Sequence, residues 1–279
     1  MNRDAGSLST YRHGSSDGWL ARLGRAGFLT KGIVYAVIGV LALRAALGTG
    51  GSTEGTQGAI LEIADQPFGQ ILLALTALGL FGYALWRIVE ATLDPEGVGT
   101  DAGGMIKRAA YVVSGISYLG LSVWCAWIVL GNDSDQRSGN SQQEWTAELL
   151  NRPFGPWIVG AIGAIIAGVG LYHFYSAYGA RFMKHYRTGE MSGTQRRWAR
   201  RAGRFGLSAR GVTFGIIGGF FIQAAIQSDP GEAEGLAGAL QTLAEQPYGP
   251  LLMGAVALGF VLYGVYCASR ARYSRFSNV

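Results

Sequence analysis

The sequence predicts an all-α membrane protein with six transmembrane helices, built from three parallel helical-hairpin repeats in a pseudo-threefold bundle. The first observation behind this prediction is a set of six apolar runs with nearly charge-free centres. They cover about residues 27–47, 69–91, 109–130, 154–179, 207–227 and 249–269. A run of about 20 apolar residues is long enough to cross ~30 Å of hydrocarbon as a helix. Buried helices of a soluble protein rarely come six at a time with such uniform length, so the membrane interpretation is preferred.

The second observation is a short phrase that occurs three times, as ADQPFG around residue 67, LNRPFG around residue 153 and AEQPYG around residue 247. The apolar run before each phrase also repeats. Its frame is an arginine, a small residue two positions later, a glycine seven later and an aromatic residue ten later. The frame gives Arg25, Gly32 and Tyr35; Arg108, Gly115 and Tyr118; and Arg204, Gly211 and Phe214. One unit is therefore a helix, an acidic loop with a short helical segment, the phrase and a second helix.

This repeat defines the expected organisation of the chain. We expect a polar N-terminal tail at 1–18, unit 1 at 19–95, unit 2 at 104–181, a basic cytoplasmic linker at 182–197, unit 3 at 198–272 and a C-terminal tail at 273–279. Two helices per unit return the chain to the side from which it entered, so the three units are parallel. They would most simply close into a pseudo-threefold bundle.

We interpret the repeated phrase as a structural corner. Proline lacks an N–H group and fits the first turn of a helix, and it displaces the preceding residue from the α region. The segments GAILEIAD, EWTAELLN and GALQTLAE, which precede the phrase, are too short to span a membrane and are predicted to lie as helices in the outer interface. The corner residues are Pro67, Pro153, Pro247, Gly69, Gly155 and Gly249, with Phe68, Phe154 and Tyr248 as anchors at headgroup depth.

The third observation is the distribution of loop charge. Eleven acidic residues and two cations lie in the loops after the first, third and fifth helices, whereas the N-terminal tail, the fourth loop and the C-terminal tail are rich in arginine. The positive-inside rule therefore predicts a multi-pass protein of the bacterial plasma membrane with both termini in the cytoplasm. The first apolar run has a later copy, so it is interpreted as an uncleaved helix. The basic fourth loop is expected to lie against anionic headgroups rather than nucleic acid.

Ionisable residues within the helices are the candidate functional residues. Lys31 and Arg210 occupy equivalent positions, where unit 2 has a serine. Further candidates lie near the cytoplasmic ends of the second helices, so that the proposed polar cluster consists of Glu90, Lys31, Arg87, His173 and Arg210. The alternative is snorkelling, in which long basic side chains near a helix end reach the headgroups. Snorkelling is preferred for the basic residues, but it explains Glu90 less well, and Glu90 therefore ranks first.

Two further patterns concern packing. Gly211, Gly215 and Gly219, and likewise Gly160, Ala164 and Gly168, stand four residues apart and are predicted to form close helix–helix seams. Cys125 and Cys267 fall inside apolar runs towards opposite ends of their helices, so a disulfide between them is not expected.

The sequence contains no CxxC or HExxH motif, no phosphate-binding loop and no paired catalytic carboxylates. We therefore expect no enzyme, metal or cofactor. No carboxylate stands at the expected membrane midplane, which argues against a cation-driven carrier. Two function classes remain: a packed membrane scaffold or accessory protein, which is preferred and would bind a membrane-protein partner or a second copy, and a passive pore or small-solute transporter along the pseudo-threefold axis.

The residues quoted above also carry a resemblance. The frame R-x-G/A-x4-G-x2-aromatic, the phrase Q/R-P-F/Y-G and the helix GLFGYALWRIVEA resemble a bacterial integral membrane family of unknown function, known from actinobacteria and cyanobacteria as tandem two-helix domains. The resemblance covers nearly the whole chain. Unit 2 departs from it, with a longer outer loop and an arginine at Arg152. The resemblance implies a membrane location and the repeat architecture, and no activity.

Overall fold

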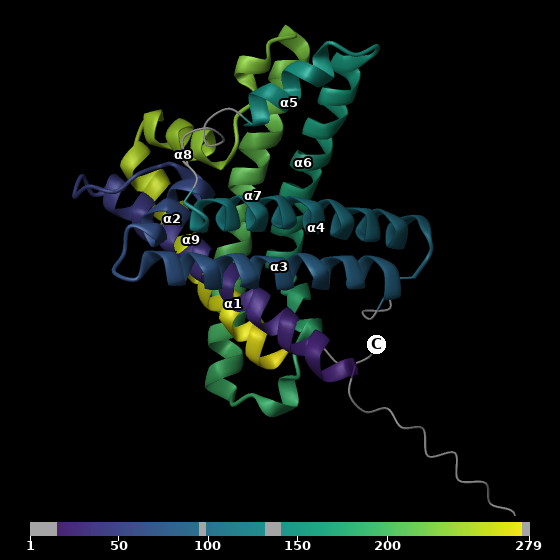
Figure 1. Cartoon of the computed structure of the whole chain (residues 1–279), viewed down its shortest axis with the longest axis vertical. Helices are drawn as coiled ribbons and strands as arrows, with labels where there is room; N and C mark the ends of the chain where they lie inside the picture. The colour runs from purple at the N-terminus through teal and green to yellow at the C-terminus, as the bar shows by residue number, and fades with distance from the viewer. Residues whose placement is uncertain (1–15, 95–98, 132–140, 275–279) are drawn as a thin grey trace, which may run out of the picture.

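The computed structural model describes residues 16–94, 99–131 and 141–274, and this part of the chain is helical (Figure 1). The long helices are α1 (Ser16–Ala46), α3 (Gly69–Leu93), α4 (Ala102–Val129), α6 (Gly155–Tyr178), α7 (Gly193–Gln227) and α9 (Gly249–Tyr273). All six are long and apolar enough to cross a membrane, which confirms the prediction of six spans in three two-helix repeats. Residues 1–15, 95–98, 132–140 and 275–279 lie outside the described part.

A short helix precedes each repeated phrase, as predicted. These helices are α2 (Gly55–Ala64), α5 (Ser141–Leu150) and α8 (Leu236–Glu245). α2 packs against α8, and α5 packs against the turn η4 (Pro230–Glu232), so the three short helices lie at the same end of the molecule. The linker between α6 and α7 lies at the opposite end and contains the turns η2 (Arg181–His185) and η3 (Thr188–Glu190).

The three corners share one backbone geometry, which differs in detail from the expectation. The amide of Gly69 donates to the carbonyl of Gln66 at 2.7 Å, and the equivalent bonds from Gly155 and Gly249 are 2.9 and 2.7 Å long. The aromatic residue between proline and glycine has a left-handed backbone, with φ of 64° at Phe68, 62° at Phe154 and 63° at Tyr248. Proline therefore opens a tight turn and does not lie in the first helical turn, because each second helix begins at the glycine.

The corner glycine is required by a close backbone contact. A Cβ atom added at Gly69 would lie 1.6 Å from the carbonyl oxygen of Ala64, at the end of the preceding short helix. The same clash would occur at Gly155 and Gly249. The aromatic residue before each glycine is about 80% exposed, at 80% for Phe68, 78% for Phe154 and 82% for Tyr248. The three rings are thus exposed at the corners between the short and the long helices, and such exposed aromatic residues are typical of segments that contact the headgroup region.

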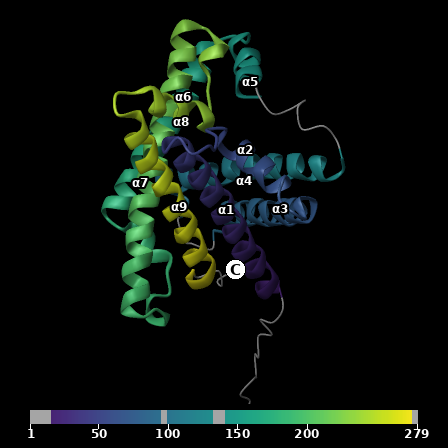
Figure 2. The same cartoon turned by 90° about the vertical axis from the view of Figure 1, so that its left-hand side faces the viewer.

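The long helices pack as neighbours in the order α4, α3, α1, α9, α7 and α6. Figures 1 and 2 show three pairs, with the α1–α9 pair between the α3–α4 pair and the α6–α7 pair. This is the neighbour order of a ring of three hairpins. In the described part of the chain this ring is not closed. The two helices of unit 2, α4 and α6, do not pack closely against each other, whereas all the other neighbours do.

The repeat glycine of each unit lies where its first helix meets the second helix of another unit. A Cβ atom added at Gly32 of α1 would lie 2.9 Å from the carbonyl oxygen of Gly264 on α9. At Gly211 of α7 it would lie 2.8 Å from the ring of Phe174 on α6, and at Gly115 of α4 it would lie 3.3 Å from the carbonyl oxygen of Ala84 on α3. Unit 1 thus packs on unit 3, unit 2 on unit 1 and unit 3 on unit 2, so the contacts follow a threefold pattern.

The small residue two positions after the repeat arginine differs between unit 2 and the two closed units. Within unit 1, a Cβ atom added at Gly27 would lie 2.5 Å from Cβ of Tyr83, and within unit 3 one at Gly206 would lie 2.6 Å from Cα of Tyr263. These glycines allow the two helices of a unit to approach each other. Unit 2 has an alanine, Ala110, at the equivalent position. The close contact at this glycine, between α1 and α3 in unit 1 and between α7 and α9 in unit 3, is not formed between α4 and α6 of unit 2.

The predicted glycine seams are only partly correct. Gly211 is in close contact, but a Cβ atom added at Gly215, Gly219 or Gly168 would meet nothing within 4 Å in the described structure. The seam between α6 and α7 instead uses Gly163 and Gly218, where an added Cβ atom would lie under 3 Å from the facing backbone. Spacing of four residues identified a smooth helix face, but not the side on which the neighbour lies.

Candidate functional site

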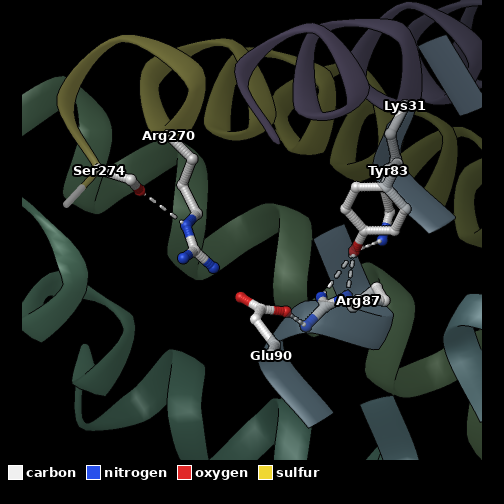
Figure 3. A network of polar contacts seen from close by, with 6 residues as sticks. All are labelled: Lys31, Tyr83, Arg87, Glu90, Arg270 and Ser274. Carbon is white, nitrogen blue, oxygen red and sulfur yellow. Dashed lines mark hydrogen bonds and ion pairs between the residues drawn. The ribbon is translucent and has the colours of Figure 1, made fainter. Parts of the chain in front are cut away.

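The candidate site begins with a hydrogen bond between the two helices of unit 1. Nζ of Lys31 on α1 donates to the hydroxyl oxygen of Tyr83 on α3 at 3.0 Å (Figure 3). Both side chains are buried, and the ammonium group also lies over the rings of Tyr83, Tyr118 and Tyr263, at 4.6, 4.8 and 5.8 Å from the ring centroids. Aromatic faces attract a cation most strongly where water is excluded. The rings therefore compensate part of the cost of burying Lys31.

The same tyrosine hydroxyl connects Lys31 to an ion pair on α3. Arg87 donates to Tyr83 through Nε at 2.8 Å and through Nη2 at 2.6 Å, and its Nη1 lies 2.7 Å from Oε2 of Glu90. The spacing of three and four residues on one helix face brings these side chains together. The structure thus joins Lys31, Arg87 and Glu90 through Tyr83, as Figure 3 shows.

Unit 3 repeats the first of these contacts with arginine in place of lysine. Nη1 of Arg210 on α7 donates to the hydroxyl oxygen of Tyr263 on α9 at 2.5 Å. The guanidinium group also lies over the rings of Tyr35, Phe214 and Tyr263, at 5.2, 4.9 and 4.8 Å. Tyr263 therefore faces both Arg210 and Lys31. We call Lys31, Tyr83, Arg87, Glu90, Arg210 and Tyr263 the cation–tyrosine cluster.

The cluster shows the repeat symmetry in its chemistry. In units 1 and 3, a cation on the first helix donates to a tyrosine on the second helix of the same unit, and it stacks on the repeat aromatic residue of the next unit, Tyr118 for Lys31 and Tyr35 for Arg210. Unit 2 has Ser114 and Val169 at the positions of the cation and the tyrosine. The unit that lacks this hydrogen bond is the unit whose two helices are apart.

The burial of the cluster corrects the snorkelling interpretation. Lys31 is 3% exposed, Arg210 9% and Glu90 1%, so these groups lie inside the helix assembly and do not reach its surface. Arg87 is intermediate, with a side chain 16% exposed. A snorkelling side chain buries its apolar stem and keeps its charged head in water, which these buried groups do not. Here tyrosine hydroxyls, aromatic rings and one carboxylate provide internal partners.

The predicted candidate His173 and a further residue, Arg270, lie beside the cluster. His173 on α6 packs edge-on against the ring of Phe214, with centroids 5.6 Å apart, and this ring also contacts Arg210. Arg270 on α9, which is equivalent to Glu90 in the repeat, stacks over Phe28 at 4.7 Å and donates from Nε to Ser274 at 3.1 Å. Figure 3 shows its guanidinium group directed towards the Glu90 carboxylate.

Sequence reasoning missed the tyrosines that hold the cluster together. Tyr83 and Tyr263 are 180 positions apart, the same offset that relates Pro67 to Pro247. The repeat alignment that paired Lys31 with Arg210 therefore also pairs these tyrosines. Buried hydroxyls of such residues normally have a hydrogen-bond partner, so the coincidence of a paired cation and a paired tyrosine was the available signal.

Within the described residues, no three His, Cys, Asp or Glu side chains are grouped to hold a metal ion. The chemical character of the cluster is instead that of a group of hydrogen-bond donors. The cluster contains three cationic side chains and one carboxylate, and Glu90 is the only acidic residue in the six candidate spans. Such an arrangement attracts negatively charged or hydrogen-bond-accepting groups.

Comparison with known proteins places this architecture in a family. The model of the family described as Domain of Unknown Function (DUF1206) matches residues 26–94, 109–180 and 205–274. The chain is also similar to the uncharacterized protein YxxB of Bacillus subtilis (strain 168), with 34% identity over 259 residues, which is 93% of each chain. No solved structure matches. The three matched segments coincide with the three helix–corner–helix units, and the chain therefore belongs to the DUF1206 family as a protein with three tandem copies of the domain.

Proposed function

We propose that this multi-pass membrane protein is a packed scaffold or accessory protein of the bacterial plasma membrane, with both termini in the cytoplasm. In this proposal it acts by binding a membrane-protein partner or a second copy of itself through its helix faces, and it neither conducts solutes nor catalyses a reaction.

The observation that carries the proposal is the filled interior between α1, α3, α7 and α9. Tyr83 is 0% exposed and lies in a stack of rings with Phe28 and Tyr118, at centroid distances of 5.2 and 4.7 Å. The central α1–α9 seam is equally close, because a Cβ atom added at Gly39 would lie 2.6 Å from the carbonyl oxygen of Ala257. A conduction path needs a polar cavity, whereas glycine contacts of this kind favour tight association in lipid.

The binding face that we infer lies on α4 and α6. Only 22% of the apolar window of α4 and 17% of that of α6 are buried within the molecule, against 56% for α1 and 50% for α3 and α9. Gly120 on α4 and Gly168 on α6 have no neighbour within 4 Å of an added Cβ atom among the described residues. Because open glycine positions allow another transmembrane helix to approach closely, these two helices are suited to helix–helix contact with another chain.

The membrane surface provides the second contact in this proposal. The first turns of α7 carry five exposed arginines before the helix enters its apolar part, namely Arg196, Arg197, Arg200, Arg201 and Arg204. Each basic residue near an anionic membrane surface contributes about 1 kcal/mol of attraction. This basic segment therefore supports binding to anionic headgroups on the cytoplasmic side.

The proposal is tested first by solute flux. Purified protein in vesicles of phosphatidylethanolamine and phosphatidylglycerol should pass sodium, potassium, chloride and glycerol no faster than protein-free vesicles. A flux that rises in proportion to the protein content, and that falls in the Arg210→Gln variant, would replace the scaffold by the second candidate, a pore or transporter. The observation that favours this second candidate is the excess of buried cations near the centre of the bundle.

The proposed binding face is tested by cross-linking in cells. A photoreactive amino acid at Ile116 on α4 or Ile165 on α6 should cross-link to another membrane protein or to a second copy, and native mass spectrometry of the purified protein separates these two cases. Leu78 on α3 is a matched control, since its exposure of 66% equals that of Ile165 and is close to the 62% of Ile116. Equal cross-linking from all three positions would show random encounters and contradict a face on α4 and α6.

A further inference from the structure

The cation–tyrosine cluster contains more buried positive charge than it neutralises. Its three cations are Lys31, Arg87 and Arg210, and Glu90, which pairs with Arg87, is the only acidic residue in the candidate spans. Charged side chains at membrane depth are rare and almost always have a partner of opposite charge or a polar cavity. Lys31 and Arg210 have tyrosine hydroxyls and aromatic rings, which are neutral. The charge balance of the cluster therefore calls for an additional negative group.

The cluster also contains an unused hydrogen-bond donor. Arg210 is 91% buried, and its Nη1 donates to Tyr263, but Nε has no hydrogen-bond partner in the described part of the chain. Buried side-chain donors in folded proteins are almost always satisfied. This orphan Nε–H is an observation independent of the charge count, and it also calls for an acceptor next to Arg210.

On the side of unit 2, the neighbours of Arg210 are an aromatic ring and a histidine. The ring of Phe214 contacts both Arg210 and His173, which places the α6 histidine beside the arginine. Unit 2 has the smaller Ser114 and Val169 where the other units have a cation and a tyrosine, and Ser114 and His173 are partly exposed. The third position of the repeat pattern is thus not filled by a cation–tyrosine pair.

We propose that Arg210 and Lys31 form an anion-binding site, in which the bound anion accepts the hydrogen of Arg210 Nε and neutralises the buried positive charge. The ligand class is a small anion with an acceptor atom, either a free halide or oxyanion or the phosphate of an anionic lipid headgroup. The proposed site does not depend on the scaffold function. An anion bound there could stabilise a packed bundle, or it could be the solute of a transporter.

The first experiment measures thermal stability in a neutral detergent at constant ionic strength. Sodium gluconate is replaced stepwise by sodium chloride, nitrate or phosphate. Because a ligand that binds only the folded state stabilises it by mass action, a Tm increase of about 5 °C is expected at a hundredfold excess over Kd. The second arm uses nanodiscs of phosphatidylcholine alone or with one quarter phosphatidylglycerol, in gluconate. Stabilisation by the salts identifies a free anion, and stabilisation only by phosphatidylglycerol identifies a headgroup.

Variants test whether the anion-dependent Tm shift arises from Arg210 and Lys31. Arg210→Gln should abolish the anion-dependent Tm shift and Lys31→Met should reduce it, whereas Arg201→Gln, which removes an exposed arginine from the same helix, should leave it unchanged. Arg210→Lys keeps the charge but lacks Nε, so it should weaken the response while retaining the fold. An equal shift in Arg210→Gln and the wild type would overturn the proposal.

Direct binding covers the case in which the Arg210 variants do not fold. Equilibrium dialysis of the wild-type protein with radioactive chloride or phosphate should show about one bound ion per chain, and Lys31→Met should weaken binding at least tenfold, which corresponds to the loss of one charge-assisted contact. Mass spectrometry of co-purified lipid performs the same test for the headgroup. Absence of both a bound ion and a stoichiometric anionic lipid would contradict the site.

Discussion

Lys31 and Tyr83 join the two long helices of unit 1 through a buried hydrogen bond of 3.0 Å, and this relationship recurs in unit 3 between Arg210 and Tyr263. The cation is on the first helix and the tyrosine on the second in both cases. Helix pairs joined in this way are also in close contact at a glycine four residues before the cation, Gly27 or Gly206. The hydrogen bond and the close contact therefore act together to hold the hairpins of units 1 and 3 closed.

The first prediction concerns the carboxylate of Glu90. Glu90→Gln removes the partner of Arg87 from a buried ion pair, and an unpaired buried charge costs on the order of 3–5 kcal/mol. Thermal unfolding in detergent should show a large fall in Tm. The double variant with Lys31→Met should be milder than the sum of the two single changes, because Lys31→Met removes part of the positive charge that Glu90 offsets.

The matched control for this prediction is Glu148→Gln, which breaks the exposed ion pair with Arg152, whose two side chains are 73% and 66% exposed. An exposed pair contributes about 0–1 kcal/mol, so its loss should hardly change Tm. Small and strictly additive effects of Glu90→Gln and Lys31→Met would show that these groups are not coupled.

The second prediction concerns the tyrosine hydroxyls. Tyr83→Phe and Tyr263→Phe each leave a buried cation without its acceptor while preserving the ring, so each should destabilise the protein by about 1.5–3 kcal/mol, as expected for hydrogen bonds of charged groups. Tyr248→Phe at the exposed third corner is the control and should be neutral. If all three variants melt together with the wild type, the aromatic rings and not the hydroxyls hold the cations.

The third prediction concerns the corner. Gly69→Ala places a Cβ atom 1.6 Å from the carbonyl oxygen of Ala64, so the backbone must move and Tm should fall by several degrees. Gly219→Ala adds the same methyl group within the long helix α7, at a position with no described neighbour within 4 Å, and should be neutral or slightly stabilising. A Gly69→Ala variant that is as stable as Gly219→Ala would contradict the backbone contact.

A fourth prediction concerns orientation in the membrane. A cysteine at Thr49, in the loop between α1 and α2, should react with an impermeant thiol reagent in intact cells, whereas a cysteine at Gly189, in the linker, should react only after the membrane is opened. Both positions are exposed, and the native Cys125 and Cys267 are buried, so background labelling should be low. The reverse pattern would place the termini outside, and labelling of both positions in intact cells would contradict six spans.

A fifth prediction concerns the docking of the α6–α7 linker on the end of α9. Tyr186 is buried there, and its hydroxyl lies 2.6 Å from Ser269 Oγ, while the backbone amide of Arg187 donates to the carbonyl of Tyr273 at 2.8 Å. Burial raises the pKa of Tyr186 above its ordinary value. The phenol of undocked Tyr186 has a pKa of about 10 and loses its proton above that pH. The docked phenol still holds its proton there.

The stability that Tyr186 contributes should accordingly be complete below about pH 10 and decrease as the pH rises above that value. Thermal unfolding between pH 8 and pH 11 should show that the wild type has a higher Tm than Tyr186→Phe at the lower end of this range. This difference in Tm should decrease in the alkaline range. Curves that remain parallel across this range would show that the hydroxyl does not titrate with docking.

Local sequence signals predicted the elements of the fold because these signals act over a few residues. An apolar run of about 20 residues needs no distant partner to become a spanning helix, since hydrocarbon leaves the backbone no other way to satisfy its hydrogen bonds. The corner phrase also acts locally, although its turn geometry at Phe68, Phe154 and Tyr248 differs from the expected helical first turn. Internal comparison of the chain with itself was sufficient to reveal the three units.

What the sequence by itself determined is therefore the set of six spans and their repeat. Only the tertiary structure decided that Lys31 and Arg210 turn inwards, because hydropathy assigns the same cost to a lysine whether its neighbours are lipid or tyrosine. It also decided which glycines form seams and that α4 and α6 separate. Each of these outcomes depends on contacts between residues far apart in the chain, which local sequence signals do not specify.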